Sequence, residues 1–91
     1  MKTLHNSDIS GARKNVHDIN VFGDGDLFKL ISKASSAAED WMKSTKAMQI
    51  DDIGCVIQVT TQQGENVSEA LTFVPNVKIE GDAPNRRIVK I

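Results

Sequence analysis

Between residues 27 and 48 the apolar positions recur at steps of three and four, which is the spacing of one face of an α-helix. No proline interrupts this segment, and Asp24 or Asp26 stands where an N-cap would satisfy the first amide groups. Lys43 and Lys46 would fall in the last turns, where the helix dipole favours cations. The spacing therefore predicts one long amphipathic helix from about Leu27 to Met48. Its buried face would consist of Leu27, Leu30, Ile31, Ala34, Ala38, Trp41, Met42, Thr45 and Met48.

Residues 55–74 follow a different pattern, because apolar and β-branched side chains alternate there with a period of two. Two such runs, 55–61 and 67–74, flank the glycine-containing segment 62–66. This arrangement predicts an antiparallel β-hairpin. The expected apolar face consists of Cys55, Ile57 and Val59 on the first strand, with Leu71 and Phe73 opposite them on the second.

The segment before residue 27 carries weaker signals. Ser7 or Asp8 could cap a short helix over Ile9–Asn15, although Gly11 disfavours it. Residues 18–22 indicate a short strand. The two glycines of residues 23–26 indicate a turn, since glycine adopts backbone angles that other residues resist.

Beyond the hairpin, residues 77–79 and 86–91 are predicted to be strands on either side of a loop at 80–85. The expected fold class is thus α+β. One long amphipathic helix would pack on a small antiparallel sheet of three to four strands, and a short helix would lie near the N-terminus.

The length of 91 residues predicts a single domain over 1–91. A chain of this size has a small core and usually depends on disulfides, a metal or oligomerisation for stability. Cys55 is the only cysteine, and together with His5 and His17 it shows no zinc-ligand spacing. The apolar Ile91 would end an open strand edge, which favours pairing with another chain. We therefore expect a homo-oligomer.

The charge balance excludes some functions. Eleven basic and twelve acidic residues nearly cancel, whereas general DNA or RNA binders carry a basic excess. No apolar run is long enough for a membrane helix, and the N-terminus lacks the apolar core of a signal peptide. The expected location is the cytoplasm.

The densest group of candidate binding residues lies at 41–46. On a helix, an indole would stand beside two ammonium groups and two hydroxyls, which suits a ring stacked on tryptophan and phosphate oxygens held by lysine. A purely structural interpretation, the end of a capped helix with a core tryptophan, stays open. Two arginines near the C-terminus could add phosphate contacts. The candidate ligand-binding residues are Trp41, Lys43, Ser44, Thr45, Lys46, Arg86 and Arg87.

Sequence motifs for catalysis or metal binding do not fit. No glycine-rich loop precedes Lys43, so the chain is not a P-loop NTPase. An EF-hand read from Asp18 would place Phe22 at a ligand position. Cys55 alternates with apolar residues, a setting in which cysteine usually packs rather than reacts. The sequence predicts a non-enzymatic protein with neither cofactor nor metal.

Two binding functions remain open, beside a third class, a small structural subunit that assembles and binds neither ligand nor partner. The first is capture or sequestration of a small phosphorylated, nucleotide-like ligand at a site formed by a homo-oligomer. The second is a small inhibitor or adaptor that binds a host protein surface through an exposed strand edge or helix. Accessory proteins of phages and mobile elements commonly belong to either class, and such an origin is a hypothesis here.

Overall fold

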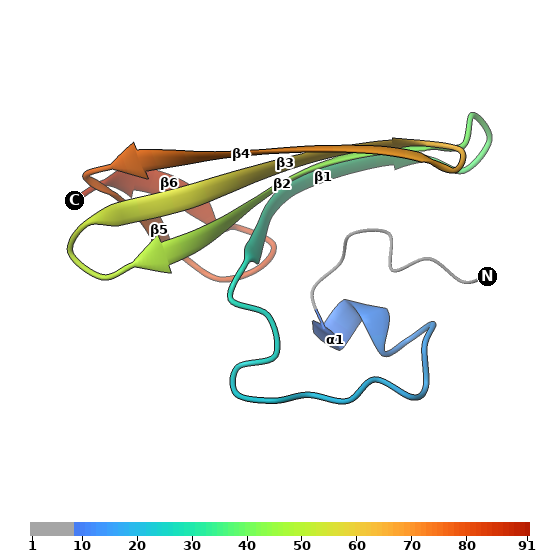
Figure 1. Ribbon diagram of the computed structural model, residues 1–91, viewed down its shortest axis with the longest axis horizontal. Coiled ribbons are helices and arrows are strands. Elements are labelled where there is room, and N and C mark those ends of the chain that lie inside the picture. Colours follow the sequence, from blue (N-terminus) through green and yellow to red (C-terminus); the bar gives the residue numbers. More distant parts are fainter. Residues whose placement is uncertain (1–8) are drawn as a thin grey trace.

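The computed structural model describes residues 9–91, and this part of the chain is nearly all β-sheet (Figure 1). Four strands form one antiparallel sheet in the order β1-β2-β3-β4, and two more form a separate hairpin, β5-β6. One four-residue helical turn, α1 (Ile9–Ala12), precedes them. The strands are β1 (Lys29–Ser36), β2 (Trp41–Ile50), β3 (Gly54–Gln63), β4 (Asn66–Pro75), β5 (Val77–Glu80) and β6 (Arg87–Lys90).

The predicted helix over Leu27–Met48 is wrong, and with it the α+β class. The segment forms β1 and β2, joined by a turn in which Ser36 Oγ accepts a hydrogen bond from Glu39 N at 3.2 Å. Asp40 closes this turn with a φ of 54°, a value that aspartate tolerates better than most residues. β2 pairs along its whole length with β3, and this pairing overrides the local helix pattern.

The predicted hairpin is confirmed as β3 and β4, but its register differs from the expected one. Cys55 lies opposite Val74 and Ile57 opposite Thr72, whereas Leu71 and Phe73 project from the other side of the sheet. Successive side chains of a strand point to opposite faces of the sheet. A shift of one residue in the register therefore moves all the apolar side chains of one strand to the other face.

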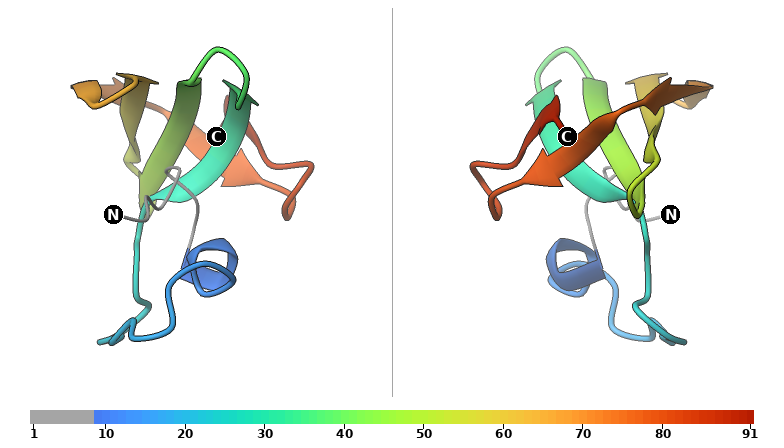
Figure 2. Two further views of the ribbon diagram at one scale, coloured as in Figure 1. Left: turned by 90° about the vertical axis from the view of Figure 1, so that its right-hand side faces the viewer. Right: turned by 90° about the vertical axis from the view of Figure 1, so that its left-hand side faces the viewer.

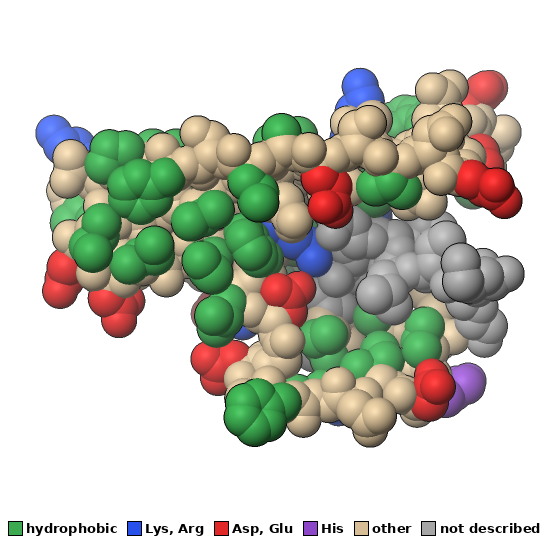
Figure 3. Space-filling model, in the orientation of Figure 1, with side chains coloured by type: hydrophobic (Ala, Val, Ile, Leu, Met, Phe, Trp, Pro, Cys, Tyr) green, Lys and Arg blue, Asp and Glu red, His purple; other side chains and the backbone are tan. Residues whose placement is uncertain are grey.

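The sheet consequently has two distinct faces. We call the face that carries Ala47 and Cys55 the rear face, and the face that carries Lys46, Val56 and Phe73 the front face. At the left-hand end of the sheet the front face is toward the viewer in Figures 1 and 3, whereas the right-hand end is seen nearly edge-on.

The β5–β6 hairpin packs on the rear face, and Figure 2 shows it on one side of the sheet only. Ile79 N donates a hydrogen bond to Gln49 Oε1 at 2.9 Å, and Cys55 Sγ lies 3.7 Å from Val77 O. Ala47 and Cys55 are completely buried beneath it. These two strands confirm the predictions for residues 77–79 and 86–91.

The chain before β1 differs in part from its prediction. The short helix spans Ile9–Ala12 rather than Ile9–Asn15, and its expected caps at Ser7 and Asp8 lie outside the described residues. Residues 18–22 form no strand. The turn at 23–26 is confirmed, since both of its glycines have positive φ and Gly25 N donates to Phe22 O at 3.2 Å.

The core of the described part is small. Its buried apolar residues are Ala12, Met42, Ala47 and Cys55, and the largest fully buried side chain is that of Cys55. Many larger apolar side chains stay exposed, including Leu71 and Phe73. The sheet therefore has more apolar surface than the described residues cover.

Candidate functional site

Trp41, Lys43 and Thr45 occupy alternate positions of β2 and so share the rear face. β2 lies between β1 and β3, and hydrogen bonding on both sides fixes the spacing of these side chains at about 7 Å per two residues. The β5–β6 hairpin contacts the other end of β2, at Gln49. Within residues 9–91, the end of the rear face that begins at Trp41 is accordingly open.

Most residues that flank this row are small or carry a hydroxyl group, and the exceptions are Gln63 beside Trp41 and Val59 beside Thr45. Trp41 stands between Ser36 and Gln63, and Lys43 stands between Ala34 and Thr61. We call this group the platform. Lys43 is its only charged residue, so the platform combines an indole, an ammonium group and several hydroxyls with no carboxylate among them. Its members are Ser32, Ala34, Ser36, Trp41, Lys43, Thr45 and Thr61.

Ser44 and Lys46 lie on the opposite side of β2, on the front face, where both are buried. Lys46 Nζ is 3.5 Å from Asp26 Oδ2, in an ion pair that holds the segment before β1 against the sheet. The structure therefore separates these two candidates from Trp41 and Lys43. In a helix Ser44 would have stood one turn from Trp41 and Lys46 one turn from Lys43, whereas in a strand adjacent residues project to opposite faces.

Arg86 and Arg87 diverge in the same way. Arg86 Nη1 donates to Leu30 O at 3.2 Å, which joins the β5–β6 hairpin to β1. Arg87 is exposed, and its Nη2 donates to Glu80 Oε1 at 2.6 Å. This hydrogen bond from Arg87, together with the charge of the guanidinium, lowers the pKa of the Glu80 carboxyl.

A second cationic group contains Lys29, which the sequence did not single out. Lys29 and Arg86 line a cavity of about 340 Å³ together with Gln49 and Asp82. Lys29 pairs with Ala47, four residues along β2 from Lys43, which is a separation of about 14 Å. Lys29 and Arg86 come together only because β5–β6 folds back onto the sheet, so no local sequence signal could have revealed their proximity.

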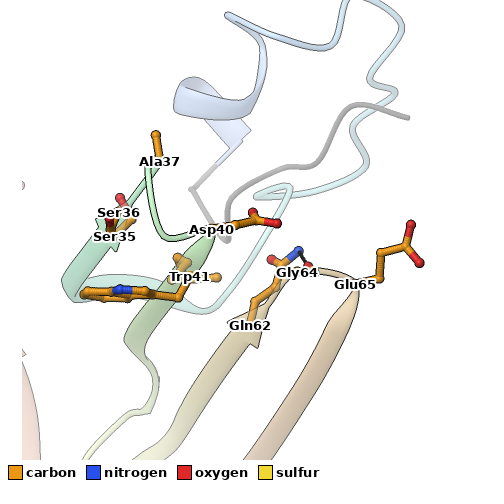
Figure 4. A pocket seen from close by; sticks show the side chains of 9 residues that line it. Ser35, Ser36, Ala37, Asp40, Trp41, Gln62, Gly64 and Glu65 are labelled. Carbon is orange, nitrogen blue, oxygen red and sulfur yellow. Dashed lines mark hydrogen bonds between the residues drawn. The ribbon is translucent and has the colours of Figure 1, made fainter.

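A cavity of about 310 Å³ lies at the end of the sheet beside Trp41 (Figure 4). The indole extends beneath Ser35 and Ser36, while Asp40 points the other way, toward Gly64. Gly64 N donates to Asp40 O at 2.9 Å, which ties the β1–β2 turn to the β3–β4 turn. Glu65 also lines the cavity, so its charged groups are acidic and it suits the edge of a ring with N–H donors better than a phosphate.

Burial raises the pKa of the Cys55 thiol, which disfavours the nucleophilic thiolate. Among residues 9–91, no three His, Cys, Asp or Glu side chains gather in a way that could hold a metal ion. Within the same residues, no helix has the length and apolar character required to span a membrane.

Comparisons with known proteins give one match. No curated protein and no solved structure matches the chain. The model of the Lockin family matches residues 1–89, which is nearly the entire sequence, and the protein therefore belongs to the Lockin family.

Proposed function

We propose that this protein is a non-enzymatic, cytoplasmic binding protein that sequesters a small phosphorylated, nucleotide-like ligand on the platform, and that it acts as a homo-oligomer. The observation that carries the proposal is the row formed by Trp41, Lys43 and Thr45 on one open face of a rigid strand. A chain with a formal net charge of -1 can hold an anion in this way because the platform itself contains a cation and no acid.

Each part of the platform has a matching part in such a ligand. An aromatic side chain contributes about 1–3 kcal/mol per stacked base, largely independent of which base it is. The Lys43 ammonium donates charge-assisted hydrogen bonds to phosphate oxygens. Ser36 and Thr61, which flank the row, can donate to sugar or phosphate oxygens from fixed positions.

The second cationic group extends the same design. Lys29 and Arg86 stand at the far end of the rear face, about 14 Å from Lys43 along the strand direction. A ring on Trp41 with a chain of phosphates directed along the face would approach both groups. Ser44, Lys46 and Arg87 are not part of the proposed site, because the first two are buried on the front face and the third is paired with Glu80.

The proposal is tested by titrating the purified protein with adenosine and guanosine nucleotides. Trp41 is the only tryptophan, so quenching of its fluorescence reports stacking directly. We expect Lys43→Ala to weaken binding at least tenfold and Lys43→Arg to restore most of it. Lys78→Ala, which removes an exposed lysine from β5, serves as the matched control and should leave the affinity unchanged. If calorimetry finds that Lys43→Ala and Trp41→Ala both bind as the wild type does, the platform is not the site.

One observation favours the second candidate, capture of a host protein. β4 is a ten-residue edge strand whose one partner among the described strands is β3, and nearly all of its side chains are exposed. Such an edge can accept a strand from another protein. Failure to bind any nucleotide, combined with a protein partner whose affinity falls when β4 is altered and not when Lys43 is, would favour this function.

A further inference from the structure

The front face carries a continuous apolar surface that residues 9–91 leave uncovered. Val56 pairs with Met48 on one side and with Phe73 on the other, and Ile50 and Leu71 extend this group. We call these five residues the front patch. Figure 3 shows hydrophobic side chains massed over β2, β3 and β4 on this face. Phe73 is 46% exposed and Leu71 is 62% exposed, although large apolar side chains of a sheet normally pack against another layer.

The elements that cover the sheet elsewhere do not cover the front patch. The β5–β6 hairpin is on the rear face, where it buries Ala47 and Cys55. On the front face, Asp26 reaches the sheet at Lys46, which precedes Met48 by two positions on β2. Among the described residues, the sheet thus has one layer behind it and, at the front patch, none in front.

The chain also exposes more surface than a compact protein of its mass. The chain exposes 6643 Å², whereas a compact monomer of 10.0 kDa exposes about 5,200 Å². The excess of about 1,400 Å² is larger than the area of about 800 Å² that each partner buries in a standard interface. One interface made by the front patch and its surroundings fits within this excess.

We propose that the front patch is the interface between two copies of this chain. None of its five residues is charged, so its only complement is another apolar surface, and a second copy supplies an identical one. Every folded copy has this excess of exposed area. A second copy is therefore available to cover it before any other partner is met. Two sheets would then stack front to front about 10 Å apart, with Phe73 and Leu71 at the centre of a shared core.

This interface does not depend on the proposed ligand. The platform is on the rear face, so in the dimer both platforms would face outward and stay accessible. Loss of the dimer and loss of ligand binding are therefore separate outcomes that different substitutions produce.

The test is the molar mass of the purified protein, measured by sedimentation equilibrium across a range of concentrations. We expect the wild type to be a dimer or a larger assembly that contains this dimer. Phe73→Glu and Leu71→Glu should each weaken association at least 100-fold, so that 10.0 kDa monomers predominate at micromolar concentration. Phe22→Glu is the matched control, since Phe22 is 98% exposed and lies in the segment before β1, and it should leave the mass unchanged.

Folding of each variant is checked by far-ultraviolet circular dichroism. Phe73 packs near Gly54, so its variant could unfold, and in that case Leu71→Glu decides the question alone. A wild type that is monomeric up to 100 µM overturns the proposal. So does an assembly whose mass is the same in the wild type and in the folded Leu71→Glu variant, because its interface must then be elsewhere, for example at the free edge of β4.

Discussion

The two faces of the β1–β4 sheet are both partly covered by the chain, and what each leaves open is chemically opposite. The rear face is covered at one end by β5–β6 and leaves a polar platform with one indole and one ammonium group. The front face is covered near Lys46 by the Asp26 segment and leaves an apolar patch. Polar open surface suits a small charged ligand and apolar open surface suits another protein chain, so one thin sheet can serve two kinds of contact.

The largest effect on the free energy of unfolding should come from filling the space beneath Phe73 on the front face. A Cβ at position 54 would collide with Val74 O and lie 2.9 Å from Pro75 Cα and 3.1 Å from Phe73 Cζ. We expect Gly54→Ala to lower the free energy of unfolding by about 3 kcal/mol, because backbone atoms cannot move aside cheaply. Urea denaturation measures the loss. Gly23→Ala is the control, since no atom lies near its Cβ, and strain at positive φ should cost about 1 kcal/mol. Equal losses would mean that Gly54 has no special packing role.

A smaller effect is expected at the ion pair between Asp26 and Lys46. Lys46 is 4% exposed, so Asp26→Ala removes the carboxylate from a buried ammonium group and should cost about 2 kcal/mol of unfolding free energy. Lys46→Met keeps most of the side-chain volume and removes the buried charge, so it should cost less than Asp26→Ala does. Thermal unfolding of both variants ranks them. The opposite ranking would show that the lysine stabilises the front face through more than its pairing with Asp26.

The smallest effect concerns the cover of the rear face and can be followed through the thiol of Cys55. The thiol is fully buried and its pKa is raised, so alkylation by iodoacetamide should be at least 100-fold slower in the folded protein than in urea. Gln49→Ala removes the acceptor of the Ile79 amide and should speed alkylation about fivefold by loosening β5–β6. Asp26→Ala should leave this rate unchanged if the two faces are covered independently. A fast reaction in the wild type would mean that the hairpin does not cover the thiol in solution.

Part of this architecture could be predicted from the sequence. The β3–β4 hairpin was predictable because its β-branched residues alternate and Gly64 supplies the positive φ of its turn. The strands β5 and β6 are short, but they were predictable because proline and glycine residues mark their ends. Their docking onto the rear face was not predictable, because it depends on contacts such as Arg86 with Leu30 that are far apart in the sequence.

The segment from Leu27 to Met48 shows why the rest of the fold could not be predicted from the sequence. Its apolar residues fit a helical spacing, yet Trp41–Ile50 also alternates, with buried Met42, Ser44 and Lys46 on one side. The pairing of β2 with two neighbours decided between the two patterns, and a sequence read locally contains no information on that pairing. The prediction of the site depended on the same choice. As a strand, the segment keeps Trp41, Lys43 and Thr45 together and removes Ser44 and Lys46 from them.

The most direct test of the account is native mass spectrometry of the protein purified from its cells of expression, followed by denaturation and mass analysis of whatever is released. The account predicts an assembly of at least two chains that carries additional mass, released as a phosphorylated, ring-containing compound, and it predicts that Lys43→Ala yields the same assembly without that mass. An assembly that carries no ligand and acquires none when nucleotides are added would contradict the proposed function.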